Sequence, residues 1–286
     1  MPETILVAAV PLGPGGTDDR ALRREAEAGI TAAAAAGARL VVLPELSFLP
    51  YVATDAPQRW SGLAESRDGP TGRFMAELAR ANRLAVLFGL AETDGRGLPV
   101  NAALLARPDG TIERAATKRC LPPRQPGDGF GESDHFRAGT DAIAVTRLGP
   151  LRLAVLICYD RRFPGHWAQA AAAGADLVAV MVAGPAPQDP PGFFRSELRA
   201  HAAGAGLFAL SAARYGVESL MGRDIRHDGE TLAVARDGKV MAAGDSASPA
   251  PIIMSIPVGR AFDAAMPTAI GTSPPTQDLP TNTRPA

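Results

Sequence analysis

The stretch Leu153–Trp167, LAVLICYDRRFPGHW, decides how the chain folds. Its first six residues, as far as Cys158, are apolar or carry a thiol, and side chains with charge or hydroxyl follow directly. A short continuous apolar run favours a strand that is buried on both faces. Phe163-Pro164 then ends the extended segment, and proline is well placed in the first turn of a helix. We therefore predict a strand ending at Cys158, a turn, and a helix near 163–173.

The same alternation of apolar runs and helical patterns recurs along the chain. Apolar runs lie at 4–10, 39–45, 84–92, 176–182 and 206–213, and helices are expected at 18–36, 71–82 and 193–203. Each half then changes to an antiparallel hairpin, with turns at 108–110 and 237–238. Two similar halves of this kind predict an α/β fold, a four-layer α-β-β-α sandwich in which two mixed sheets pack face to face.

The sequence divides into a folded domain at 1–262 and a tail at 263–286 that is rich in Pro and Thr and has no period. Two interpretations of the tail stay open. It is a disordered segment, which we prefer, or an arm that clasps another subunit.

Composition excludes several classes of function. The chain has 286 residues, of which 46% are hydrophobic and 21% charged, so we expect a folded protein. Its net charge is -1, so we expect no overall electrostatic attraction to nucleic acid or to an anionic membrane. Residues 1–10 are too short to cross a bilayer and do not match a signal peptide, so a cytoplasmic location is expected. Two cysteines and four scattered histidines indicate no disulfide framework and no metal site.

Three ends of predicted strands carry candidate catalytic residues, because loops converge where strands of an α/β sheet end. Glu45 follows the run RLVVLP, where partial desolvation favours general-base work, although a surface glutamate is the commoner case. Lys118 follows the first hairpin, where a fixed ammonium stabilises an oxyanion and lowers the pKa of a neighbouring thiol. The alternative for Lys118 is a solvated cation.

Cys158 is the candidate nucleophile. Within a strand a cysteine is usually an inert small hydrophobe, but at the end of one its sulfur meets backbone N–H groups that favour a thiolate. Cys120 has no such setting, and we interpret it as a packing residue or a neighbour of the site. A disulfide between Cys120 and Cys158 is conceivable, but the expected compartment argues against it.

The ordered set LPEL, TKRCLP and LICYDRRFP resembles the nitrilase or carbon-nitrogen hydrolase superfamily over about residues 4–256. The resemblance implies the sandwich fold, no cofactor, and a Glu, a Lys and a Cys as catalytic residues, here Glu45, Lys118 and Cys158. It also implies a second glutamate, Glu132 in GESDHF, that orients the lysine or the substrate amide. Cys158 would attack a carbonyl carbon, Lys118 would stabilise the oxyanion, and Glu45 would move the proton.

Within the superfamily, CYDRRFP is most similar to the N-carbamoyl-D-amino-acid amidohydrolases, whose arginines hold the α-carboxylate of the substrate. Arg161 or Arg162 would then form a forked pair with that carboxylate. The alternative is that one of them pairs with Asp160 and the other faces solvent. This chain departs from that branch in having Cys120 and Phe130 where it has histidines, Gly165 where it has a glutamate, and no Asn-Thr contact in MVAGPAPQDPP.

The expected function is therefore that of a hydrolase acting on a C–N bond of a small carboxylate-bearing amide or N-carbamoyl amino acid through a thioester, with release of ammonia. A simple aliphatic or ω-amide amidase is the alternative within the superfamily, and an inactive binding or scaffold homologue is the alternative of another class. The resemblance also implies a homodimer or homotetramer.

Two weaker enzymatic readings remain. PLGPGGTDDR lies between a strand and a helix like a phosphate loop, but its glycines lack the required spacing. Cys158 with His166 would make a Cys-His pair across a turn, although a core or surface histidine is commoner.

Overall fold

A computed structural model describes residues 3–14, 19–125, 127–186, 188–220, 222–245 and 250–258. Its helices are α1 (Arg20–Ala35), α2 (Pro70–Asn82), α3 (Glu132–His135), α4 (Pro164–Ala172) and α5 (Phe193–Ala205). The expectation of a separate tail at 263–286 falls outside the described residues.

The strands form two six-stranded mixed sheets and one two-stranded sheet. The first sheet has the order β14 (Ile252–Val258), β1 (Glu3–Ala9), β2 (Leu40–Val42), β3 (Ala85–Glu92), β4 (Val100–Ala106) and β5 (Ile112–Thr117). The second has the order β13 (Val240–Ala243), β12 (Leu232–Val234), β9 (Phe208–Ala213), β8 (Leu177–Val182), β7 (Leu151–Ile157) and β6 (Val145–Leu148). The small sheet pairs β10 (Val217–Leu220) with β11 (Arg223–Arg226).

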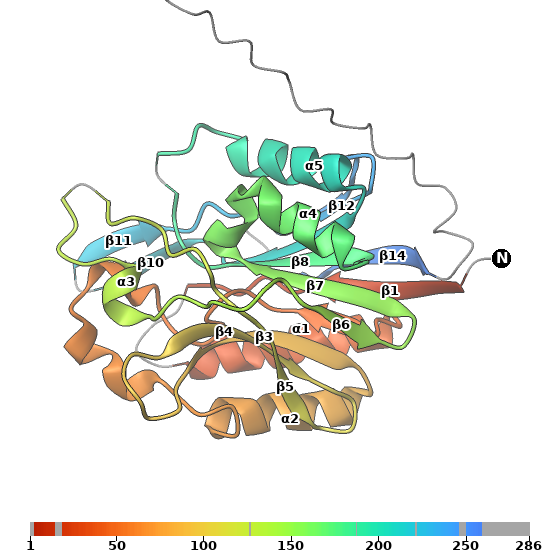
Figure 1. Ribbon diagram of the computed structural model, residues 1–286. Helices are drawn as coiled ribbons and strands as arrows, with labels where there is room; N and C mark the ends of the chain where they lie inside the picture. The colour runs from red at the N-terminus through yellow and green to blue at the C-terminus, as the bar shows by residue number, and fades with distance from the viewer. Residues whose placement is uncertain are drawn as a thin grey trace, which may run out of the picture.

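The two large sheets repeat one plan. In each of them three adjacent strands run parallel, β1, β2 and β3 in the first and β7, β8 and β9 in the second, and antiparallel strands flank them. The sheets face each other, with α1 and α2 outside the first sheet and α4 and α5 outside the second (Figure 1). The four-layer α-β-β-α sandwich predicted from the sequence is confirmed.

Burial on both faces explains the apolar runs. Along β1, Ile5, Val7 and Ala9 point into the core between the sheets, while Ala8, and Val10 just after the strand, point into the core under the helices. Side chains of a strand alternate between its faces, so a strand with two buried faces admits few polar residues. Asn101 in β4 and Ser211 in β9 are buried exceptions, and the candidate residues Glu45, Lys118 and Cys158 follow the ends of strands.

The helices and both hairpins predicted from the sequence are present, with bounds that differ by one or two residues. The turns follow the predicted chemistry, since Gly110 and Gly238 have φ of 82° and 80°, a region that favours glycine. The sequence did not indicate β6, the β10–β11 pair, or the antiparallel pairing of β14 with β1. These strands are short, polar on one side, or paired across almost the whole chain, so local periodicity does not reveal them.

Among the described residues, no helix is both long enough and apolar enough to cross a bilayer.

Candidate active site

Glu45 lies in a tight turn after β2 that a glycine in the neighbouring strand makes possible. Gly89 in β3 donates its N–H to Ser47 Oγ at 2.9 Å and accepts from Ser47 N at 3.1 Å. A Cβ on Gly89 would lie 2.2 Å from Leu46 N and 2.7 Å from the carbonyl carbon of Glu45. The close approach of this turn to β3 buries Glu45 to 1% exposure.

Lys118, directly after β5, is fully buried between two carboxylates. Its Nζ lies 2.8 Å from Glu45 Oε1 and 2.6 Å from Glu132 Oε2. Burial alone lowers the pKa of Lys118, but the charges of Glu132 and Glu45 outweigh burial and raise this pKa well above its ordinary value. The lysine is therefore a fixed cation rather than the solvated one that the sequence left open.

Two groups that the sequence did not single out hold the carboxylate of Glu45. Asn101, in β4, donates from Nδ2 to Glu45 Oε1 at 2.7 Å, and the backbone N–H of Ala183 donates to Oε2 at 3.0 Å. Ala183 directly follows β8, so the second sheet also helps to fix Glu45, which lies in the turn after β2 of the first sheet. No sequence signal marks Asn101, because it lies inside an otherwise apolar strand.

Glu132 begins α3, which lies on the left in Figure 1. Burial raises the pKa of Glu132 to about 7, since desolvation and the charge of Glu45 oppose the lowering by Lys118. A single ammonium cannot neutralise two buried carboxylates, so this group of three takes up a proton near neutral pH.

Cys158 opens a 3₁₀ turn, Cys158–Arg162, at the end of β7, and its φ of 49° is unusual for a residue with a side chain. Burial raises the pKa of the Cys158 thiol to about 12, reinforced by the charge of Glu45 and opposed by those of Lys118 and Arg161. The expectation that backbone N–H groups favour a resting thiolate is therefore wrong. Desolvation dominates here, and the resting group is a thiol that needs a base.

Asp160 joins the segments that carry Lys118 and Cys158. Its carboxylate accepts the backbone N–H of Cys120 at 2.7 Å and that of Arg119 at 3.1 Å, both just after Lys118. It also accepts from Ile157 N, just before Cys158, at 3.3 Å. The Asp160 side chain is buried, with 2% exposure, and it holds the segment after Lys118 next to the turn of Cys158.

The two arginines of CYDRRFP have partners other than Asp160, which corrects one alternative drawn from the sequence. Arg161 is buried, pairs with Glu197 at 2.9 Å, and donates from its terminal NH1 nitrogen to the Cys158 carbonyl at 3.0 Å. Arg162 pairs with Asp189 and keeps 23% side-chain exposure. Arg161 therefore supports the turn of Cys158, and Arg162 is the more accessible of the two.

Tyr51 is a further residue near the site, and the sequence did not indicate it. Burial raises the pKa of Tyr51 well above its usual value, the charges of Glu132, Cys158 and Glu45 add to this rise, and the charge of Lys118 opposes it. Its ring lies over Gly184, where a Cβ would come within 3.0 Å of it. The sequence signal was a tyrosine six residues after Glu45, which alone indicates nothing.

The residues of the phosphate-loop and Cys-His hypotheses have other hydrogen-bond partners in the structure. Gly13, in the proposed phosphate loop, donates its N–H to the carboxylate of Glu25 at 2.9 Å, and 15–18 lie outside the described residues. His166 directs Nδ1 at the carbonyl of Asp160 at 2.9 Å. Cys120 and Cys158 are both free thiols.

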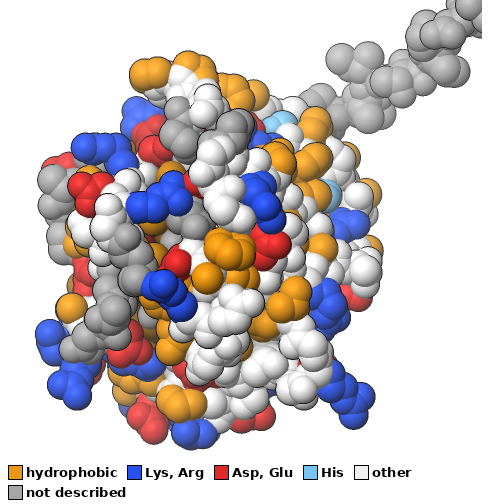
Figure 2. Space-filling view, turned by 90° about the vertical axis from the view of Figure 1, so that its left-hand side faces the viewer, with side chains coloured by type: hydrophobic (Ala, Val, Ile, Leu, Met, Phe, Trp, Pro, Cys, Tyr) orange, Lys and Arg blue, Asp and Glu red, His pale blue; other side chains and the backbone are white. Residues whose placement is uncertain are grey.

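Figure 2 looks onto the end of the molecule that carries α3, with basic and acidic side chains interspersed around hydrophobic ones. Two stacked mixed sheets, with a glutamate, a lysine and a cysteine just beyond the ends of β2, β5 and β7, are typical of the nitrilase class of α-β-β-α proteins. The chain belongs to the carbon-nitrogen hydrolase family, whose sequence profile matches residues 6–261.

Among curated proteins, the chain is similar to a hydrolase from the pqqF 5' region of Pseudomonas protegens, with 35% identity over 54% of this chain and 52% of that protein. It is 30% identical to a beta-ureidopropionase of Arabidopsis thaliana over 52% of this chain and 36% of that protein. A citrullinase of Francisella tularensis is 25% identical over 77% of each chain. The chain thus spans about half the length of the first of these relatives and less of the second.

Among solved structures, an amidase of Nesterenkonia from the nitrilase superfamily superposes with a TM-score of 0.76 at 23% identity, covering 88% of this chain and 90% of that one. A carbon-nitrogen hydrolase of Helicobacter pylori gives 0.76 at 21% identity, covering 88% of each. These likenesses concern the fold.

Proposed function

We propose that the protein hydrolyses a C–N bond of a small carboxylate-bearing amide or N-carbamoyl amino acid, through a thioester on Cys158, and releases ammonia. The observation that carries this proposal is the buried set of Glu45, Lys118 and Glu132, whose charges act directly on the Cys158 thiol. Amide and ureido carbonyls are poor electrophiles, so a nucleophile, an oxyanion partner and a proton carrier are all required.

Lys118 supplies the oxyanion partner. An ammonium has three N–H donors, and two of them point at Glu45 and Glu132. The third remains for an oxygen that becomes negative during the reaction. Because the two carboxylates fix Nζ in place, this donor needs little reorganisation when charge develops.

Glu45 carries the proton. Its Oε1 accepts from Asn101 and Lys118, whereas Oε2 accepts from the Ala183 N–H and retains a further lone pair. Glu45 takes the thiol proton as sulfur bonds to the carbonyl carbon, then gives it to the nitrogen as the C–N bond breaks. A water molecule, losing a proton to Glu45, attacks the thioester, and that proton returns to sulfur.

The carboxylate of the substrate is assigned to Arg162. Arg161 is buried and already bonded to Glu197 and to the carbonyl of Cys158. Arg162 is partly exposed, and its partner Asp189 is a single carboxylate that a substrate carboxylate can replace. The name of the similar beta-ureidopropionase supports a ureido compound, and the name of the similar amidase supports the alternative of a simple amide.

The test is ammonia release from a panel of N-carbamoyl amino acids and neutral amides. We expect turnover of acidic substrates by the wild-type chain and its loss in Cys158→Ala. Arg162→Gln is expected to raise KM for acidic substrates by about tenfold or more, since a charge-assisted pair contributes about 1.5–3 kcal/mol, and to leave KM for neutral amides unchanged. Arg195→Gln, which removes an exposed arginine paired with Glu230, is the matched control. Equal effects of Arg162→Gln on both substrate classes would refute the assignment.

Covalent labelling of Cys158 distinguishes an active hydrolase from an inactive scaffold homologue. A solved variant of the Nesterenkonia amidase shows covalent addition of the acetamide moiety of fluoroacetamide at its active site cysteine. We expect the same reagent to label Cys158 in the wild-type chain, as measured by mass spectrometry of peptides. Iodoacetamide is a weaker test, because iodide is a good leaving group and this reagent also alkylates ordinary free thiols, of which Cys120 is one. A scaffold homologue would stay unlabelled and release no ammonia from any substrate.

A further inference from the structure

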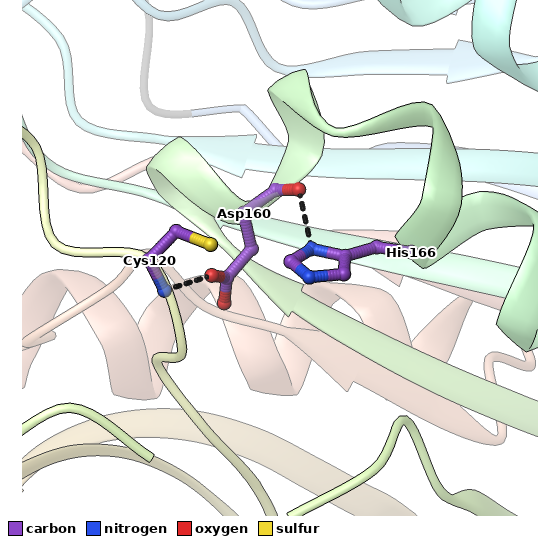
Figure 3. A group of neighbouring side chains, drawn as sticks. All are labelled: Cys120, Asp160 and His166. Atoms are coloured by element: carbon purple, nitrogen blue, oxygen red, sulfur yellow. Dashed lines mark hydrogen bonds between the residues drawn. The ribbon is translucent and has the colours of Figure 1, made fainter. Parts of the chain in front are cut away.

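A cluster of ligand-type side chains lies beside the site, outside the Glu45, Lys118 and Glu132 set. Cys120, Asp160 and His166 each offer one sulfur, oxygen or nitrogen atom, and these atoms all lie within 4.8 Å of one another. Figure 3 shows the sulfur of Cys120 and the ring of His166 both directed at the side chain of Asp160. The three residues come from the loop after β5, the turn after β7 and the first turn of α4.

The ring of His166 is held in one tautomer. Its Nδ1 lies 2.9 Å from the Asp160 carbonyl, and because a carbonyl only accepts, Nδ1 carries the proton. The lone pair is then on Nε2. A histidine that binds a metal usually donates its other ring N–H to a backbone carbonyl or a carboxylate, and this ring has that arrangement.

The carboxylate of Asp160 has capacity for another partner. Oδ1 accepts short bonds from Cys120 N and Arg119 N, at 2.7 and 3.1 Å. Oδ2 has long backbone contacts of 3.3 Å, to Arg119 N and Ile157 N, and the Cys120 thiol forms a side-chain hydrogen bond with this carboxylate that a metal ion would replace. Since a carboxylate offers about four lone-pair sites, Oδ2 is the oxygen available for a cation.

The Cys120 thiol completes a mixed donor set. It is a free, half-buried cysteine, and burial first, then the negative charge of Asp160, raises its pKa, so it is protonated at rest. Thiolate sulfur, imidazole nitrogen and carboxylate oxygen are the ligand types that zinc takes in proteins. Tetrahedral bonds of about 2.0–2.3 Å put ligand atoms about 3.5 Å apart, so side-chain shifts of about 1 Å would close the site.

We propose that Cys120 Sγ, His166 Nε2 and Asp160 Oδ2 bind a divalent transition-metal ion of the zinc class, with water in the fourth position. Binding replaces the S–H bond of Cys120 by a metal–sulfur bond and releases the proton to solvent, and no electron is transferred. The ion joins the loop after Lys118 to the turn after Cys158. Because it binds the folded chain in preference to the unfolded one, it raises the stability of the fold.

The experiment is a titration of the purified full chain, first freed of metal, with Co²⁺ followed by absorption. Wild-type protein is expected to show thiolate-to-cobalt charge transfer and tetrahedral d–d bands that saturate at one ion per chain. Cys120→Ser should lose the charge-transfer band. His166→Asn keeps an N–H for the Asp160 carbonyl but lacks Nε2, and should bind roughly tenfold more weakly or worse. Cys158→Ser, which removes the other thiol, is the matched control and should bind like the wild type.

Thermal unfolding with Zn²⁺ gives a second readout. Saturating Zn²⁺ should raise Tm of the wild-type and Cys158→Ser chains and leave that of Cys120→Ser unchanged, and Tm without metal shows that each variant folds. No charge-transfer band in the wild type, a band that persists in Cys120→Ser, or one that vanishes in Cys158→Ser would overturn the proposal. No substrate is needed, so failure here leaves the proposed hydrolase function intact.

Discussion

At the scale of single residues, the balance of charge around Lys118 governs the site. One buried ammonium faces two buried carboxylates, and each contact is 2.8 Å or shorter. Burial, reinforced by the charge of Glu45, raises the pKa of Glu132 to about 7, and the same two causes raise the pKa of Cys158. A neutral thiol and a fixed cation are the resting state that follows.

Glu132→Gln should change how stability depends on pH. With a pKa raised from 4.5 to about 7, the folded chain binds a proton on Glu132 that the unfolded chain has released, so this group makes stability fall as pH rises from 4.5 to 7. The slope has an upper limit of about 1.4 kcal/mol per pH unit. Urea unfolding at pH 5, 6 and 7 should show a smaller decrease in Glu132→Gln. Glu113→Gln, at a partly exposed carboxylate, is the control, and an unchanged slope in Glu132→Gln would contradict the prediction.

Lys118→Met should destabilise the chain as well as inactivate it. Removing the cation leaves two buried carboxylates facing each other, and breaking a buried pair costs about 3–5 kcal/mol. Loss of an oxyanion donor lowers kcat by about 10²–10³. Lys118→Met combined with Glu132→Gln should recover part of the stability but no activity. Recovery of activity in the double variant would show that Lys118 does not act on the oxyanion.

At the scale of elements, single backbone contacts between strands and turns place the candidate catalytic side chains. Gly89 lets the turn of Glu45 lie against β3, and the Ala183 N–H brings β8 to the same carboxylate. The strands and the turns that end them could be predicted from the sequence, because apolar runs and Pro and Gly signals are local. Asn101, Ala183 and Tyr51 could not, because their contacts join segments far apart in the chain.

Gly89→Ala adds only one methyl group but should lower kcat strongly. Its Cβ would lie 2.2 Å from the backbone nitrogen of Leu46, so the turn must move and take Glu45 with it. Overpacking of this kind costs about 1–3 kcal/mol. Gly165→Ala, at the start of α4 where a Cβ meets open space, is the matched control. Thermal unfolding and ammonia release together check the prediction, and wild-type kcat in Gly89→Ala would contradict it.

At the scale of the whole molecule, β14 closes the first sheet beside β1, near the start of the chain. Met254 and Ile256 of β14 are buried in the core between the sheets. A chain ending at Pro251 should therefore aggregate, because it opens the edge of β1 and empties part of the core. A chain ending at Phe262 should keep the Tm of the full chain if 263–286 are only a tail. Light scattering distinguishes the two interpretations of the tail, because loss of an arm between subunits would lower the mass of the expected dimer or tetramer.

The amino-acid sequence by itself determined the layers of the fold and the types of residue at the strand ends. Buried strands require apolar runs, and the polar or thiol side chains at the ends of those runs made Glu45, Lys118 and Cys158 candidates, whose catalytic roles were then implied by the resemblance to the carbon-nitrogen hydrolases. The protonation state of the thiol, the partners of Arg161 and Arg162, and the meeting of Cys120, Asp160 and His166 were decided only by the tertiary structure. Desolvation and charge interactions depend on distance in space, and segments far apart in the chain carry no local record of that distance.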